Sequence, residues 1–138
     1  MSEQYEVLAI RYGTRESSAA EVFLNYHAYH EPDRPLRMDY FFWVARNAAR
    51  TVVVDTGFSP VGGAARDGPP LASDAVHYYE ELERDRPFAT VANRPDLYAA
   101  FDQISELAQA PGTRVVAGHD PLVAERFGRS GPVIQLSA

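Results

Sequence analysis

The fold that we expect is built around two neighbouring segments, Leu36–Val44 (Leu-Arg-Met-Asp-Tyr-Phe-Phe-Trp-Val) and Thr51–Val54 (Thr-Val-Val-Val). The first begins by alternating and then becomes fully apolar, as in a buried strand, and the second consists of β-branched residues. Asn47-Ala48-Ala49 lies between them and favours a turn. The pattern therefore predicts two strands joined by a short turn, with Asp55-Thr56-Gly57 at the end of the second strand.

The rest of the chain predicts strands and one strong helix. The helix is expected over Asp96–Ala110, because Pro95 suits its first turn and Leu97, Phe101, Ile104 and Ala108 form one apolar stripe. The other predicted elements are strands at Tyr5–Tyr12, Thr113–Ala117 and Pro132–Leu136, a strand end at Leu71–Asp74, a loop over Ser17–Pro35, a short helix or turn at His77–Asp85, and a helical turn at Leu122–Phe127.

Composition narrows the class of protein. The 138 residues suit a single domain, and a net charge of −6 argues against a nucleic-acid surface. No cysteine is present, so a metal site would use His, Asp or Glu. The polar start of the sequence and the lack of a long apolar stretch lead us to expect a cytoplasmic protein that does not interact with membranes.

Two short segments place a good metal ligand just after an apolar run. Leu71–Tyr79 carries Asp74, and Val115–Leu122 carries His119 after a glycine that permits a sharp turn. Each residue also has a purely structural interpretation. Asp74 is a plausible helix N-cap, and His119 is a plausible partner for loop hydrogen bonds.

Together with the strands before them, these segments resemble the metallo-β-lactamase-fold hydrolases, and most closely the N-acyl homoserine lactonases. The similarity covers Tyr5 to about Ala65 and Leu71 to about Phe127. It implies an α/β fold: a truncated metallo-β-lactamase αββα sandwich, with a mixed sheet and flanking helices. We therefore expect one truncated domain over 1–138, with the junction of the missing segment near 64–70.

The resemblance also implies roles for individual residues. Asp74 matches the aspartate that bridges two zinc ions, and His119 matches the last metal-binding histidine. His77 matches the position beside the substrate carbonyl, so His77 and Asp74 are the expected catalytic residues. The implied reaction is zinc-dependent hydrolysis of a lactone or similar ester.

The sequence departs from the family at the metal site. The family signature H-x-H-x-D-H and a further metal histidine are missing, and the only histidines are His27, His30, His77 and His119. We expect an incomplete metal site, weak or absent zinc binding, and impaired or absent activity. His27 and His30 are interpreted as surface residues, Tyr40–Trp43 as core, and Glu80–Arg86 as a solvated face.

Two alternatives remain open. Val52–Gly57 also resembles the active-site motif of homodimeric retroviral-type aspartic proteases, in which Asp55 would be catalytic. The other alternative is a non-catalytic scaffold that self-associates through an exposed apolar face, because large bare apolar patches rarely stay open.

Overall fold

The computed structural model describes residues 4–54, 75–91 and 93–136. Their helices and strands, in chain order, are β1 (Glu6–Ser18), α1 (Ala19–Val22), η1 (Tyr26–Tyr29), β2 (Pro35–Arg46), β3 (Thr51–Val54), α2 (Tyr79–Arg84), α3 (Arg94–Ala108), α4 (Leu122–Phe127), β4 (Arg129–Ser130) and β5 (Val133–Gln135). The predicted linker over 59–70, the strand end over 71–74 and the junction near 64–70 all lie outside these ranges.

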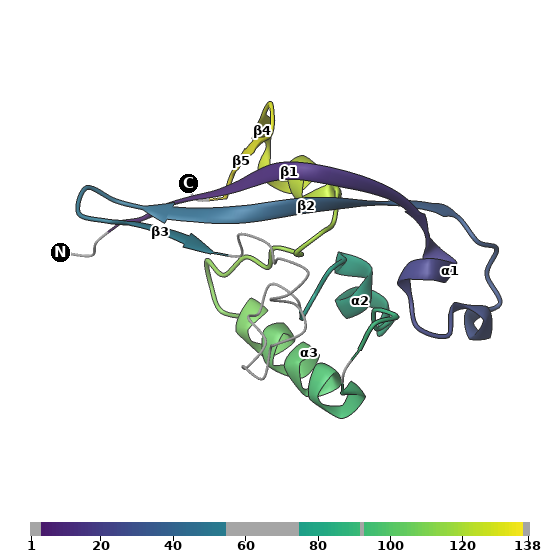
Figure 1. Cartoon of the computed structure of the whole chain (residues 1–138). Coiled ribbons are helices and arrows are strands. Elements are labelled where there is room, and N and C mark those ends of the chain that lie inside the picture. Colours follow the sequence, from purple (N-terminus) through teal and green to yellow (C-terminus); the bar gives the residue numbers. More distant parts are fainter. Residues whose placement is uncertain (1–3, 55–74, 92, 137–138) are drawn as a thin grey trace. The chain divides into compact units, whose positions relative to one another are not determined.

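One sheet organises the described strands. Its order is β3-β2-β1-β5-β4, and β1 and β2 are its two long members (Figure 1). The ladders β2–β3, β1–β5 and β4–β5 are antiparallel. Trp43 pairs with Val54 and Arg46 with Thr51, which confirms the predicted hairpin.

The expected mixed sheet of an αββα sandwich is wrong. Parallel strands need a crossover of a dozen or more residues, whereas β2–β3 and β4–β5 are joined by short turns that bring antiparallel neighbours together. The predicted strand at 113–117 is not formed either, so no strand follows the long helix α3 directly. The described part of the chain is a small antiparallel sheet with few, mostly short helices.

The turn between β2 and β3 follows from one side chain. The Asn47 side-chain oxygen accepts the backbone N–H groups of Ala49 and Arg50, both at 2.9 Å. An asparagine that bonds to the backbone two and three residues later stabilises a tight reversal. The hairpin leaves β3 at the edge of the sheet, where Val52, Val53 and Val54 are 45%, 49% and 36% exposed.

Helix α3 begins two residues before the predicted start. The Asn93 side chain accepts the backbone N–H of Asp96 at 3.3 Å, which satisfies one of the donors that a helix leaves open at its N-terminus. Pro95 lies in the first turn, as predicted. Of the predicted apolar stripe only Phe101 is buried, at 3% exposure.

The chain divides into two compact units. Unit 1 comprises Met1–Thr14, Asp39–Pro69 and Pro121–Ala138, and unit 2 comprises Arg15–Met38 and Pro70–Asp120. The core of unit 1 includes Leu8, Ala9, Phe41, Val123 and Ile134. The core of unit 2 is more aromatic and includes Phe23, Tyr26, Tyr78, Tyr79 and Phe101. The candidate site lies entirely within unit 2.

Candidate functional site

Three rings form a stack in unit 2. The ring centroids of His77 and Phe88 are 4.0 Å apart with an angle of 10° between the planes. The centroids of His77 and His119 are 5.1 Å apart with an angle of 20°. His77 is therefore held between an apolar ring and a second imidazole, and the two histidines singled out in the sequence lie side by side.

Backbone hydrogen bonds place these rings next to one another. The N–H groups of Gly118 and His119 donate to the carbonyls of Val76 and His77, at 2.7 and 2.9 Å. Gly118 is buried and precedes His119, so the chain passes close to the segment that carries His77. The contact between the two histidines is therefore set by main-chain pairing.

Glu81 lies next to His77 and is completely buried. One carboxylate oxygen accepts the N–H groups of His77 and Tyr78, at 2.5 and 2.7 Å, and the other accepts the N–H of Phe88 at 3.2 Å. The His77 ring nitrogen Nδ1 lies 3.7 Å from Glu81 Oε2. Burial raises the pKa of Glu81 to about 7, against the opposing effect of the three N–H donors and of His119. The expectation that Glu80–Arg86 is a solvated face is therefore wrong at this residue.

The same expectation is wrong at Arg86, which is 6% exposed. Its guanidinium donates to both carboxylate oxygens of Glu31, at 2.6 and 2.9 Å, and to Glu80 at 2.9 Å. It also lies over the Tyr29 ring, 4.3 Å from the centroid. Hydrogen bonding to Glu31 raises the pKa of Arg86 further above its ordinary value, so Arg86 is a fixed structural cation.

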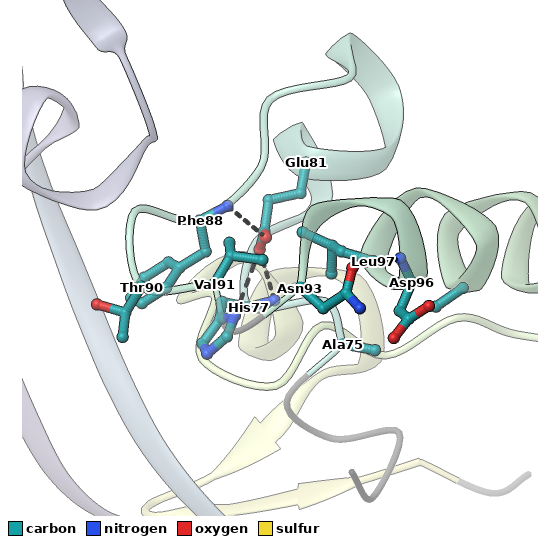
Figure 2. A pocket seen from close by; sticks show the side chains of 10 residues that line it. Ala75, His77, Glu81, Phe88, Thr90, Val91, Asn93, Asp96 and Leu97 are labelled. Carbon is teal, nitrogen blue, oxygen red and sulfur yellow. Dashed lines mark hydrogen bonds and ion pairs between the residues drawn. The ribbon is translucent and has the colours of Figure 1, made fainter. Parts of the chain in front are cut away.

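A cavity of about 320 Å³ opens beside His77 (Figure 2). Its wall is built by Glu81 of α2, by the segments before and after α2, and by the first turns of α3. The apolar part of the wall comes from Ala75, Phe88, Val91, Leu97 and Ala100. The polar part comes from His77, Glu81, Thr90, Asn93 and Asp96. A mostly apolar cavity of this size with a few polar groups suits a small organic ligand.

The structure describes some of the site residues that were predicted from the sequence, and others lie outside its described ranges. His77 and His119 are brought together, whereas Asp74 and Asp55 lie outside the described residues. His27 and His30 are both exposed, as predicted for surface histidines. Of the predicted core run Tyr40–Trp43, Phe41 is buried and the other three are partly exposed.

The described residues do not fit a zinc centre. Within residues 4–54, 75–91 and 93–136, no group of three or more His, Cys, Asp or Glu side chains could hold a metal ion. An ion bound by an imidazole lies in the plane of that ring, and the stacked, nearly parallel planes of His77 and His119 do not share such a point close to both rings. The arrangement instead suits an imidazole that faces an apolar cavity.

Sequence reasoning missed Glu81 and Asp120. Asp120 is 5% exposed, and its carboxylate accepts the backbone N–H of Tyr79 at 3.0 Å, at the first residue of α2. Glu81 is the third residue of α2 and accepts the N–H of the residue before the helix, as in one half of a capping box. That spacing from Tyr78 was the available signal, although Tyr is not a usual capping residue.

Comparisons of the chain with protein-family models, with curated proteins and with solved structures each give no match. Among the described helices, none has the length and apolar character needed to cross a membrane.

Proposed function

We propose that this protein binds a small lactone or ester in the cavity of unit 2, with His77 beside the carbonyl group, and that it hydrolyses such a ligand slowly. The observation that carries the proposal is the position of His77. Its imidazole lies on the wall of a largely apolar cavity of about 320 Å³ and is fixed between Phe88 and His119. The resemblance of the segments around His77 and His119 to lactonases supports the same substrate class.

The proposed chemistry uses the neutral form of the His77 imidazole. His77 accepts a proton from a water molecule while the water oxygen attacks the carbonyl carbon of the ligand. The bond between that carbon and the ring oxygen then breaks, and the proton passes to the departing oxygen, which gives a hydroxy acid. The apolar wall favours a ligand with a hydrocarbon tail, because burial of such a tail contributes about 0.8 kcal/mol per CH₂ group.

The test uses γ-decalactone, which combines a lactone ring with an apolar tail. Binding is followed through the backbone amide resonances of the full chain, and ring opening is followed by pH-stat titration in the presence of EDTA. We expect shifts at cavity residues such as Leu97 and Ala100, and a rate lowered by His77→Gln. His30→Gln is the matched control, because His30 is exposed and lies outside the cavity wall. Unchanged resonances at millimolar γ-decalactone would refute the proposal.

A second candidate function, self-association, is favoured by a specific observation in unit 1. The edge strand β3 exposes three consecutive valines and carries no charged residue. Charged residues and prolines are common devices against edge-to-edge pairing, and β3 lacks them. Light scattering after size-exclusion chromatography tests this candidate. Val53→Lys should reduce the mass at high concentration, whereas a monomer at every concentration would rule self-association out.

A further inference from the structure

The hydrogen bonds of Glu81 reach beyond the helix on which it lies. A glutamate at the third position of a helix commonly accepts the N–H of the residue before the helix, and Tyr78 provides that bond at 2.7 Å. Glu81 makes two further bonds that capping does not require. It accepts the N–H of His77, the residue before Tyr78, and the N–H of Phe88, which follows Glu81 by seven residues.

The two extra bonds are made to the two residues of one ring contact. His77 and Phe88 stack at 4.0 Å, and the backbones of both are tied to the same carboxylate (Figure 2). Both residues also line the cavity. The carboxylate therefore fixes the part of the wall where the imidazole lies.

The Glu81 carboxylate lies next to one particular nitrogen of the His77 imidazole. Nδ1 of His77 is 3.7 Å from Glu81 Oε2. An ionised carboxylate next to Nδ1 favours the tautomer in which Nδ1 carries the proton. In this tautomer Nε2 has a free lone pair, which is the form that a general base requires.

We propose that Glu81 is the positioning residue of this site: it fixes His77 against Phe88 and selects the tautomer with the proton on Nδ1. This inference rests on the proposed function for its biological meaning, because it makes Nε2 the nitrogen that acts on the ligand. This role of Glu81 requires no contact with the ligand. Its effect on the reaction passes through His77.

The experiment records long-range ¹H–¹⁵N spectra of the histidine rings in the full chain at pH 8, which lies above the pKa of about 7 of Glu81, so that its carboxylate is mostly ionised. His77→Gln assigns the His77 signals. We expect the wild-type protein to show His77 in the form protonated on Nδ1. A wild-type spectrum with the proton on Nε2 would overturn the proposal without any need for a Glu81 variant.

Glu81→Gln then tests the cause. We expect His77 to lose its single tautomer and the dissociation constant for γ-decalactone to rise on the order of tenfold, as when one buried hydrogen bond to a charged group is lost. Glu80→Gln is the matched control, because Glu80 lies on the same helix and pairs with Arg34, Arg84 and Arg86. It should leave the His77 spectrum unchanged.

The two proposals fail in different ways. If γ-decalactone does not bind but the His77 tautomer depends on Glu81, the proposed function is wrong and the positioning role stands. If γ-decalactone binds and Glu81→Gln, shown by circular dichroism to be folded, keeps the His77 tautomer, the positioning role is wrong. If Glu81→Gln does not fold, the wild-type tautomer alone decides the matter.

Discussion

The carboxylate of Asp120 accepts the backbone N–H of Tyr79 at 3.0 Å, so the segment that carries His119 caps the helix that follows His77. The first N–H groups of a helix have no partner within the helix, and a buried carboxylate is a strong acceptor for one of them. Asp120 comes directly after His119, and Tyr79 comes two residues after His77. The proximity of the two histidines is therefore part of how unit 2 folds.

Asp120→Ala should lower the free energy of unfolding by about 2 kcal/mol, because it removes a helix cap and leaves a buried N–H without an acceptor. Urea denaturation followed by circular dichroism measures the change. Asp102→Ala is the matched control, since Asp102 is exposed on α3, and it should change stability by about 0.5 kcal/mol or less. Equal effects of the two substitutions would contradict the capping role.

The stability of the protein should depend on pH through Glu81. Burial raises the pKa of Glu81 from an ordinary value of 4.5 to about 7. The folded protein thus binds this proton more tightly than the unfolded chain, so the stabilisation is complete below pH 4.5 and is lost as the pH rises through 7. The backbone N–H groups of His77, Tyr78 and Phe88 and the nearby His119 oppose this shift, but burial has the larger effect.

The comparison of wild type with Glu81→Gln isolates this effect, because glutamine does not titrate. Between pH 4.5 and 8 the wild-type free energy of unfolding should fall relative to that of the variant, by up to about 3 kcal/mol. Urea titrations at several pH values supply both curves. Parallel curves would show that the pKa of Glu81 is ordinary.

Arg86→Lys should destabilise the protein by about 1–2 kcal/mol although it conserves the charge. Lysine cannot bond both oxygens of Glu31 in a fork, and it cannot lie flat over the Tyr29 ring. Thermal unfolding measures the loss. Arg84→Lys serves as the control, because the Arg84 side chain is 51% exposed and such ion pairs contribute little. A larger loss for Arg84→Lys would mean that the forked contact is unimportant.

Zinc should bind weakly, and no more than one ion per chain is expected. The resemblance would make His119 one ligand, but the described residues provide no group of three. Elemental analysis after gel filtration should find well under one zinc per chain, and His119→Ala should weaken what remains in equilibrium dialysis. His27→Ala is the control, since His27 is exposed. Two zinc ions retained per chain would contradict this expectation.

Local patterns predicted the hairpin well. The strands at Leu36–Val44 and Thr51–Val54 consist of strand-forming residues, and Asn47 forms the turn through its own side chain. Each of these elements could therefore be predicted from its own residues. Helix α3 was predicted for the same reason, with Asn93 missed as its cap. The strand expected at 113–117 was wrong because a short apolar run becomes a strand only where a partner strand is available.

The site was harder to predict because its contacts are distant in sequence. The resemblance identified His77 and His119, and backbone pairing across some forty residues brings them together. The charges of Glu81 and Arg86 favoured a solvated surface, yet both side chains are buried. Backbone N–H groups donate hydrogen bonds to Glu81, and Arg86 donates hydrogen bonds to carboxylates. Such burial depends on tertiary neighbours, which residue type alone does not reveal.

The acidic caps of α2 also have a consequence for hydrogen exchange with solvent. The amide hydrogens of His77, Tyr78, Tyr79 and Phe88 all donate to the side chains of Glu81 or Asp120. Amides at the start of a short helix ordinarily exchange early, because no carbonyl holds them. Here they should be among the slowest to take up deuterium in unit 2. The N-terminal end of α2 would then be the part of this short helix that resists local opening longest.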